Sequence, residues 1–397
     1  MSKTTQKNCI SCGKKKLRNL INLKNFPITG IFCKKVTNQK KNLELLYCNN
    51  CSHIFHTTQI KRNTYNPKIY LNKPSKNFLA NQALKFFSKF VLKNLEQEKN
   101  NNFLEIGAGD TSFYNLIKQN SKFYCIIDPA MKNYYSNRQK LRIYQTKLEN
   151  FNLKKITSKI NIDAVLLSHV IEHTQNPKLF LKNIVDNISK NTKIFIEIPC
   201  TELMIKNLRF DQIFFNHISY FTSESIRQLF KNLGLTILDS KINLQHWGGT
   251  VLFALTINKE EKKVSNFYTV KNTHKIFLRN FQIFKNKMKI IKKIISKKRG
   301  IIGYGAGQNT PTLGYFLNTD LSFLKYIADD DTRKHEKYCI NTSPKIKKFN
   351  RADLNNNSCL ITAVDNSKIL TQKLIKLKFK SREIINIKKI LNPSNNF

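Results

Sequence analysis

The sequence predicts an α/β fold in three parts, two of which hold a mostly parallel sheet covered by helices. Between residues 73 and 262, short apolar runs alternate with amphipathic segments, as in parallel strands joined by crossover helices. A shorter series of the same kind occupies residues 263–397. Residues 1–72 have little periodicity and hold five of the nine cysteines, so this part needs a staple to fold.

The chain is strongly basic, with 69 Lys and Arg against 25 Asp and Glu and a formal net charge of +44. Such a charge is compatible with binding to nucleic acid, because Lys and Arg neutralise phosphates. The basic residues are spread along the whole chain, however, which favours a solvated basic surface over a nucleic-acid footprint. Binding to an acidic membrane surface is a third alternative.

The amino terminus, MSKTTQKNCISCGKKK, lacks the apolar stretch of a secretory signal. No run of about 18 apolar residues indicates a membrane span. We therefore expect a cytoplasmic protein. Thiols stay reduced in that compartment, so disulfides are not expected.

Two C-x-x-C pairs lie in the amino-terminal part, Cys9 with Cys12 and Cys48 with Cys51. A two-residue spacer lets one tight turn present two sulfurs to one ion, and Zn²⁺ is often held by four thiolates. The pattern predicts a structural zinc site at residues 1–72. Four thiolates leave no open position for water, so this zinc would not be catalytic. A redox-active pair is the alternative.

The stretch FLEIGAGDTSFYNLI predicts a strand ending at Glu105, a turn with Gly107 and Gly109, and a helix from about Thr111. In such a turn, backbone amides can approach a ligand closely. A second strand is predicted to end at Asp128, whose carboxylate can bind two ribose hydroxyls. The third glycine of a dinucleotide fingerprint is absent. The acidic Glu105 before the glycines and the Asp-Pro after the second strand fit S-adenosylmethionine better than a dinucleotide. Caps on the loop amides and on the strand end are the structural alternatives for the two carboxylates.

The segment IDAVLLSHVIEHTQNPKLFLKNI, with His169, Glu172 and His173, resembles the fourth-strand segment of class I S-adenosylmethionine-dependent methyltransferases. The whole chain resembles one architecture: C-methyltransferases with an N-terminal zinc-binding module, a methyltransferase core and a C-terminal domain. Their best known members methylate a carbon of nucleotide-linked keto-deoxysugars. The resemblance implies a class I Rossmann-like core at residues 73–262 and a C-terminal Rossmann-like α/β domain at 263–397.

The resemblance also implies a set of cofactor-binding residues from four loops: Glu105, Gly107, Gly109, Asp128, Leu148 and His169. Glu105 and the glycines would line the methionine end of S-adenosylmethionine, Asp128 would hold the ribose, and Leu148 would lie near the adenine. His169 would orient the cofactor loop. His169 and His173 also have the i, i+4 spacing of metal ligands, but no third ligand lies nearby in the sequence.

The segment FDQIFFNHISYF resembles the family signature Tyr-His-Glu-His followed by Ser-Tyr-Phe. His217 and Tyr220 match it, whereas Phe214, Phe215 and Asn216 replace its first three residues. The resemblance implies that the imidazole of His217 removes a proton from a carbon beside a ketone. Tyr220 or Asn216 could donate a hydrogen bond to the developing enolate oxygen. A helix cap for His217 and a core position for Tyr220 are the structural alternatives.

Three further features complete the prediction. Apolar residues between 277 and 295 recur at steps of four and three, which predicts an interdomain packing helix or, less simply, a membrane-surface helix. The QHWGGT turn with His246 resembles the family's glycine turn near the sugar site, although a hairpin would use the same glycines. In the last hundred residues, GYGAG is followed by Asp329 and Asp330, which implies a nucleotide-holding domain or a structural duplicate.

Three functions remain as hypotheses. The first is an S-adenosylmethionine-dependent C-methyltransferase of a nucleotide-linked keto-deoxysugar, with His217 as general base and a structural zinc. The second is an O- or N-methyltransferase of another small molecule, because the signature has lost its Tyr and Glu. The third is a zinc-containing nucleic-acid-binding protein, which would need aromatic residues interleaved with Arg in one patch. For an enzyme we expect a small-molecule acceptor, no nucleic-acid partner and a monomeric chain.

Overall fold

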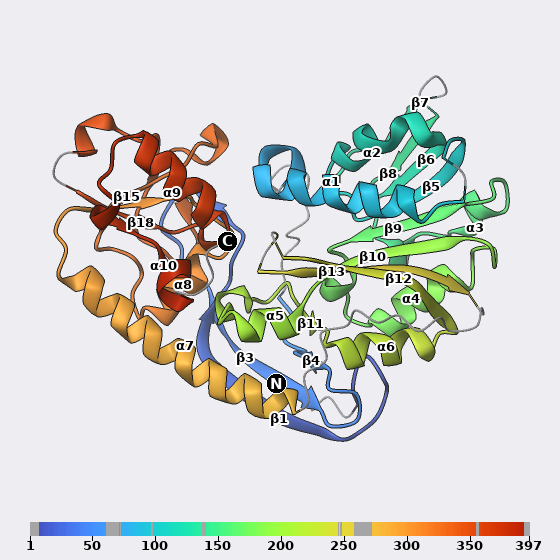
Figure 1. Ribbon diagram of the computed structural model, residues 1–397, viewed down its shortest axis with the longest axis horizontal. Coiled ribbons are helices and arrows are strands. Elements are labelled where there is room, and N and C mark those ends of the chain that lie inside the picture. The colour runs from blue at the N-terminus through green and yellow to red at the C-terminus, as the bar shows by residue number, and fades with distance from the viewer. Residues whose placement is uncertain are drawn as a thin grey trace.

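The computed structural model describes most of the chain, in these ranges: 8–60, 71, 73–96, 98–136, 140–244, 246, 248–257, 272–354 and 357–392. Two α/β domains lie at opposite ends of the molecule, and an amino-terminal sheet and a long helix join them along one side (Figure 1). The charged segment NKEEKKVSN (258–266), whose composition predicts a linker, lies outside the described residues.

The larger sheet has eight strands in the order β12-β13-β10-β9-β5-β6-β8-β7. Their bounds along the chain are β5 (Asn101–Ile106), β6 (Ser121–Ile127), β7 (Tyr134–Ser136), β8 (Leu141–Tyr144), β9 (Ala164–Ser168), β10 (Lys193–Pro199), β12 (Leu235–Asn243) and β13 (Thr250–Ile257). The five adjacent strands β10, β9, β5, β6 and β8 are parallel to one another. Strand β13 runs antiparallel to its neighbours β10 and β12. This order is that of a class I methyltransferase, and it confirms the predicted fold class.

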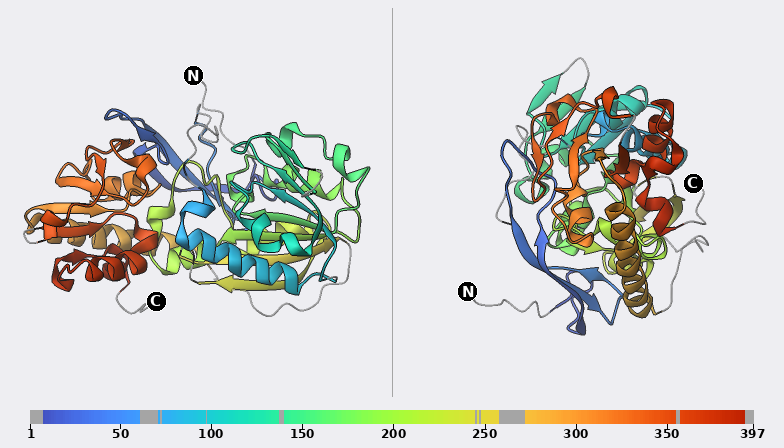
Figure 2. Two further views of the ribbon diagram at one scale, coloured as in Figure 1. Left: turned by 90° about the horizontal axis from the view of Figure 1, so that it is seen from above. Right: turned by 90° about the vertical axis from the view of Figure 1, so that its left-hand side faces the viewer.

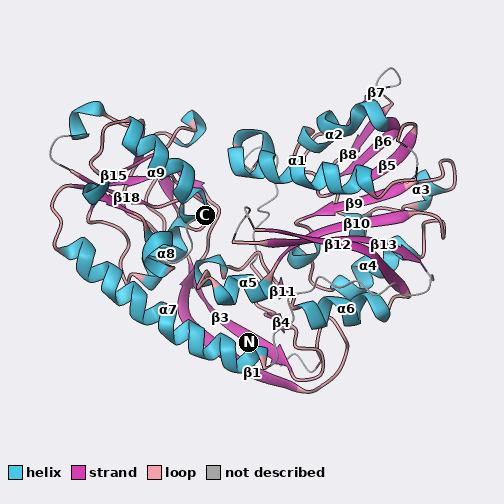
Figure 3. Ribbon diagram, viewed as in Figure 1, coloured by secondary structure: helices cyan, strands magenta, loops and turns pink. Residues whose placement is uncertain are grey.

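Helices cover both faces of this sheet, as Figure 3 shows. They are α1 (Phe78–Lys93), α2 (Ser112–Ile117), α3 (Lys154–Thr157), α4 (Pro177–Val185), α5 (Thr201–Lys206) and α6 (Ser223–Lys231). One apolar core packs α1 and α2 on one face of the sheet, and another packs α3, α4 and α6 on the opposite face. Local capping fixes the helix starts: Asn77 caps α1, and Thr222 forms a capping box with Ser225 at α6.

The amino-terminal part forms a sheet that contacts both domains. Strand β1 (Leu17–Pro27) pairs with β3 (Lys40–Cys48), and β4 (Ile54–Phe55) joins β3 to β11 (Ser219–Tyr220) of the first domain. In a separate two-stranded sheet, β2 (Phe32–Cys33) pairs with β16 (Tyr338–Cys339) of the carboxy-terminal domain. Seen from above, the amino-terminal sheet crosses between the two domains (Figure 2). The amino-terminal part therefore connects the two α/β domains through contacts with each of them.

The carboxy-terminal domain has a parallel sheet of five strands in the order β17-β15-β14-β18-β19. The remaining elements are β14 (Ile301–Tyr304), α8 (Thr310–Phe316), β15 (Leu324–Ala328), β17 (Ile346–Lys347), β18 (Ser358–Ile361), α9 (Ser367–Lys376), β19 (Ile384–Ile385) and α10 (Ile387–Leu391). A parallel five-stranded sheet with helices confirms the predicted Rossmann-like domain.

Helix α7 (Thr273–Ser296) carries the predicted apolar stripe. All six stripe residues are buried, at 6% exposure or less: Phe277, Phe281, Phe284, Met288, Ile291 and Ile295. They share one core with β1, with α5 and with the carboxy-terminal domain. The interdomain packing helix is thus confirmed. In the part of the chain that the structure describes, no helix combines the length and apolar character needed to traverse a bilayer.

Candidate active site

A pocket of about 480 Å³, which we call the interdomain pocket, lies between the two α/β domains. Residues of both glycine loops line it, together with four histidines. Six of the predicted site residues line this pocket: Glu105, Gly107, Gly109, His169, Asn216 and His217. Because these residues come from three separate segments of the chain, the fold has assembled most of the predicted site at one place.

The glycine loop after β5 has the predicted turn. Gly107 and Gly109 have positive φ angles of 75° and 71°, and a Cβ on Gly107 would lie 2.6 Å from the Val170 side chain. The carboxylate of Asp128 accepts hydrogen bonds from the amides of Gly109 (2.7 Å) and Ala130 (2.5 Å). Asp128 is thus a strand-end cap that holds the loop. The Met131 amide also donates to this carboxylate. A carboxylate has about four lone-pair sites, so these three bonds leave part of its acceptor capacity for ligand hydroxyls.

The Glu105 carboxyl is buried at the pocket wall, with 5% exposure. Tyr124 donates a hydrogen bond of 2.7 Å to it. Burial raises the pKa of Glu105 to about 8, because the charged form loses hydration. A cationic ligand bound beside it would favour the ionised carboxylate.

Leu148 lies in the core of the first domain, at 2% exposure, and does not line the pocket. It begins a short 3₁₀ turn after β8, and this turn points the side chain into the apolar core against the sheet. The side chain of Leu148 is therefore part of the core, and its place near the adenine stays a prediction.

His217 is buried, with 4% exposure, and reaches the pocket wall from the loop before β11. Its ring lies 4.0 Å from that of Phe214 and 4.9 Å from that of His173, measured between centroids. Burial lowers the pKa of His217 well below its usual value, and neighbouring imidazoles lower it further. The ring is therefore neutral at pH 7 and able to accept a proton.

Tyr220 does not line the interdomain pocket, and its side chain is 5% exposed. Its hydroxyl accepts a hydrogen bond of 3.1 Å from the Phe214 amide. The predicted role as a donor to the substrate is therefore not supported; Tyr220 instead holds the turn that carries His217. The alternative for His217, a helix cap, is not observed, because Thr222 caps α6 through its bond with Ser225.

His169 directly follows β9 and has a left-handed backbone, with φ of 56°. Its Nδ1 lies 3.1 Å from Glu172 Oε1, and its Nε2 lies 4.0 Å from Glu197 Oε1. Burial alone would lower the pKa of His169, but these two carboxylates raise it overall. His173 bonds elsewhere, through Nδ1 to the Asn216 carbonyl oxygen at 2.7 Å. The i, i+4 spacing thus does not make His169 and His173 one metal site.

An ion pair that the sequence did not indicate connects the two domains beside the pocket. The guanidinium of Arg209, fully buried, donates two hydrogen bonds of 2.8 Å to Asp211 and one of 2.6 Å to Asp365. Burial of the guanidinium opposes its charge, but the two carboxylates raise the pKa of Arg209, so it stays charged. Nothing local marks Arg209, because its partner Asp365 is 156 residues away.

The glycine loop of the carboxy-terminal domain forms the opposite wall of the pocket. Gly305 has a positive φ of 92°. The Asp329 carboxylate accepts a hydrogen bond of 2.6 Å from the Ala306 amide. Lys334 lies 3.3 Å from the same carboxylate and donates a bond of 3.0 Å to the Ala306 carbonyl oxygen. This loop is therefore bound by Lys334, a lysine of the same domain.

The four predicted zinc ligands lie together and are buried. The Sγ atoms of Cys9 and Cys51 are 3.8 Å apart, and those of Cys12 and Cys48 are 3.6 Å apart. A tetrahedral ion with bonds of about 2.3 Å to sulfur has sulfur–sulfur distances of about 3.8 Å. The donor set and its spacing therefore fit a Zn²⁺ ion.

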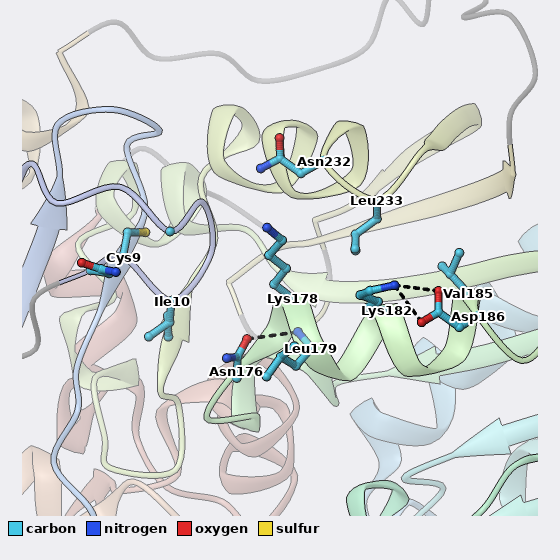
Figure 4. Close-up of a pocket in the computed structure, with 12 residues that line it drawn as sticks. Cys9, Ile10, Asn176, Lys178, Leu179, Lys182, Val185, Asp186, Asn232 and Leu233 are labelled. Atoms are coloured by element: carbon cyan, nitrogen blue, oxygen red, sulfur yellow. Dashed lines mark hydrogen bonds and ion pairs between the residues drawn. The ribbon is translucent and has the colours of Figure 1, made fainter.

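A second hollow, of about 700 Å³, lies between the first cysteine turn and α4 (Figure 4). It is lined by Cys9 and by residues on α4 and just after α6. Its carboxylate, Asp186, is already bound by Lys182 at 2.8 Å. Among the described residues, neither of the two glycine loops at 105–109 and 303–307 and no histidine lines this hollow, so we place the chemistry in the interdomain pocket.

Two family models match the chain. Residues 78–240 match the model described as a methyltransferase domain, and residues 247–369 match the C-methyltransferase C-terminal domain. The chain is also similar to the C-methyltransferase NovU of Streptomyces niveus, with 40% identity over 60 residues. That stretch covers 15% of this chain and spans only 14% of the length of NovU.

Solved structures of methyltransferases are similar to about half of the chain. N-methyltransferase NodS from Bradyrhizobium japonicum WM9 has a TM-score of 0.35 and 12% identity, covering 46% of this chain and 90% of NodS. Magnesium protoporphyrin IX methyltransferase ChlM from Synechocystis PCC 6803 has a TM-score of 0.33 and 11% identity, covering 46% of this chain and 84% of ChlM. The assignment therefore depends on the two family-model matches: they identify a methyltransferase domain that is followed by a C-methyltransferase C-terminal domain.

Proposed function

We propose that the whole protein transfers a methyl group from S-adenosylmethionine to a carbon beside a ketone in a nucleotide-linked keto-deoxysugar. One observation carries this proposal: the buried, neutral imidazole of His217 lines a pocket whose opposite walls are the glycine loops of the two domains. One wall suits the methyl donor, and the space towards the other suits an acceptor with a bulky carrier group. The C-methyltransferase C-terminal domain match supports carbon as the acceptor atom.

The donor would be held by the loop after β5. Asp128 would accept hydrogen bonds from the ribose hydroxyls through its remaining lone pairs, and Glu105 would face the cationic methionine end. The bound cofactor supplies an electrophilic methyl group. Gly107 has no side chain, so the backbone can pass close to the ligand. A side chain at this position would also collide with Val170.

His217 would remove the proton from the acceptor carbon, and its neutral form at pH 7 suits that step. Asn216 lines the same pocket and could donate its side-chain amide to the oxygen on which charge develops. The family signature has Tyr and Glu at positions that are Phe214 and Asn216 here, so this chain relies on fewer charged groups around the base.

We also propose that Cys9, Cys12, Cys48 and Cys51 hold one structural Zn²⁺ ion, which the sulfur spacing supports. The last of these cysteines lies three residues before β4, and β4 pairs with β11, just after His217. The ion would therefore stabilise the strand that supports the catalytic loop.

The variant His217→Ala tests the reaction. We expect the rate of methyl transfer to a nucleotide-linked keto-deoxysugar to fall at least about a hundredfold, because a positioned base contributes that much. Calorimetry should find S-adenosylhomocysteine affinity unchanged within about threefold, since the base acts on the acceptor and not on the donor. Activity retained within a few-fold would contradict the role of His217.

The acceptor is found by a thermal-shift screen of nucleotide sugars with S-adenosylhomocysteine present, since a ligand that binds the folded state raises its melting temperature. NMR of the product then locates the methyl group. A methyl group on oxygen or nitrogen would replace our proposal with the second hypothesis.

The zinc proposal is tested by metal analysis of the purified chain and of Cys48→Ser. We expect about one zinc per chain, its loss in Cys48→Ser and a melting temperature lower by at least about 5 °C, because metal binding contributes folding free energy. Cys33→Ser is the matched control, because Cys33 lies in β2 outside the four-sulfur cluster. Well-folded protein without metal would refute the site.

A further inference from the structure

Three potential metal ligands meet at the pocket wall from separate parts of the methyltransferase domain. His169 directly follows β9, Glu197 lies in β10, and His246 lies in the loop before β13. One ligand atom from each residue lies within 4.8 Å of the others. Metal ligands with bonds of about 2.1 Å lie about 3 to 4.2 Å apart, so small side-chain rotations would close this triad around an ion.

The surroundings of the triad are those of a metal site. Glu172 binds the Nδ1 atom of His169 at 3.1 Å, which fixes the ring with Nε2 facing Glu197. Glu197 accepts hydrogen bonds of 2.8 Å from the hydroxyls of Ser168 and Thr250. Metal-binding histidines usually pair their second nitrogen with a carboxylate, and metal-binding carboxylates are themselves hydrogen-bonded.

The local charge also points to a cation. Glu172 and Glu197 are both 1% exposed. Among the described residues, neither has Lys or Arg within ion-pair distance, and His169 alone approaches both. One oxygen of Glu172 has no hydrogen-bond partner in the described part of the chain. Buried carboxylates are costly unless a positive charge compensates them, and a single imidazole compensates at most one.

We propose that His169, Glu197 and His246 bind a divalent cation such as Mn²⁺, Fe²⁺, Co²⁺ or Zn²⁺. Two imidazoles and one carboxylate are a donor set that suits these ions and leaves coordination positions open. His169 and His246 line the interdomain pocket, so an ion bound by them would lie at the wall of this pocket. This site is separate from the four cysteines, which form a closed set of thiolates.

A second triad, Glu172 with His173 and His217, also has ligand atoms within 4.8 Å. We prefer the first triad because His173 Nδ1 already binds the Asn216 carbonyl oxygen and because the proposed function uses the imidazole of His217 as a base. In this arrangement Glu172 is a positioning residue for His169.

The role of the cation, unlike its binding, rests on the proposed function. When His217 takes the proton, the C–H bond breaks and its electron pair moves towards the ketone oxygen. The carbon then bonds to the methyl group, the bond from methyl to sulfur breaks, and the sulfonium becomes a neutral thioether. A cation at the triad would stabilise the negative charge on the ketone oxygen. It would supply the stabilisation that Tyr220 does not, since its hydroxyl is turned to the Phe214 backbone.

The test uses the full-length chain with its cysteine-bound metal retained. Mn²⁺ binding is followed by the electron paramagnetic resonance signal of free Mn²⁺, and Co²⁺ binding by optical spectra without sulfur charge-transfer bands. We expect one Mn²⁺ per chain and an affinity at least tenfold lower in His246→Ala. His274→Ala, on α7 and away from the pocket, is the matched histidine control and should bind as the wild type does.

Failure of Mn²⁺ and Co²⁺ to bind, or equal affinity in His246→Ala, would overturn the site. Glu197→Gln repeats the test at a second ligand, with its melting temperature recorded so that misfolding is recognised. If the cation binds but no keto-sugar is methylated, the proposed function fails and the site stands. If methylation proceeds at the full rate after Mn²⁺ and other weakly held metal are removed, the catalytic role of the site is excluded.

Discussion

The two glycine loops that face each other across the pocket have the same local structure but different partners. The sequences EIGAG (105–109) and GYGAG (303–307) both begin with the last two residues of a strand, β5 and β14 respectively, and continue into the turn. In each, a glycine has positive φ, and a loop amide donates to an aspartate at the end of the next strand. The shared geometry is therefore a property of the Rossmann-like turn and not of a ligand.

The two loops differ in how much acceptor capacity their aspartates have left for a ligand. Asp329 is paired with Lys334 at 3.3 Å, and this lysine also binds the loop carbonyl of Ala306. Asp128 has no ion pair among the described residues and keeps lone pairs for hydroxyl groups. The first loop is thus prepared for a ligand, whereas the second is neutralised by its own domain. A loop sequence alone does not distinguish the two.

A second difference lies two residues before the first turn glycine. The methyltransferase loop has the buried carboxyl of Glu105 there, whereas the other loop has Gly303, against which Ile327 and Leu324 would lie 3.0 Å from an added Cβ. One loop places a titratable group at the pocket, and the other uses the position for close packing.

Glu105→Gln tests the role of the buried carboxyl in the first loop, and we expect it to have the largest effect of the loop variants. The folded pKa of Glu105, about 8, lies above its ordinary value of 4.5, so the folded state binds more protons between these values. The free energy of unfolding should therefore fall as pH rises from about 4.5 to 8, by up to a few kcal/mol at about 1.4 kcal/mol per pKa unit. Glu105→Gln should lose this dependence in denaturation measured at pH 5 and pH 8.

Glu149→Gln is the matched control, because Glu149 is an exposed carboxylate and should leave the pH dependence unchanged. If Glu105→Gln and Glu149→Gln have the same profile, Glu105 is ionised in the folded protein and the proposed difference between the loops is wrong.

Gly107→Ala and Gly305→Ala test what the loops share. An added Cβ would lie 2.6 Å from Val170 in the first and 2.5 Å from Ala363 in the second, and both glycines have positive φ. Backbone strain and overpacking should each cost about 1–3 kcal/mol, so we expect a loss of about 3 kcal/mol in both variants. Thermal unfolding measures this loss. A large loss in only one variant would show that the two turns are not equivalent.

Asp128→Asn and Asp329→Asn test what the loops do not share, with the smallest effect. Loss of charged hydrogen bonds to ribose should weaken S-adenosylhomocysteine binding by about tenfold or more in Asp128→Asn. Asp329→Asn should leave that affinity within about threefold, because Asp329 is already bound by Lys334. Isothermal titration calorimetry measures both. Equal effects would contradict the assignment of the cofactor to the first loop.

The sequence predicted the parts of the site that depend on neighbouring residues. The turn at Gly107 and Gly109, the strand-end carboxylate of Asp128 and the apolar stripe of α7 are all where the patterns placed them. Leu148 and Tyr220 were predicted from a resemblance, and the structure turns both away from the pocket. The resemblance indicates where each residue lies along its segment, but the direction of its side chain depends on how that side chain packs against the rest of the protein.

The sequence by itself therefore determined the fold class, the two glycine turns and the cysteine pairs, because sterics, periodicity and spacing act over a few residues. Only the tertiary structure decided which distant side chains meet. It separated His169 from His173 and placed it beside Glu197 and His246, and it joined Arg209 to Asp365 across the domains. Such contacts depend on the order and register of strands, which bring together residues that are far apart in the chain.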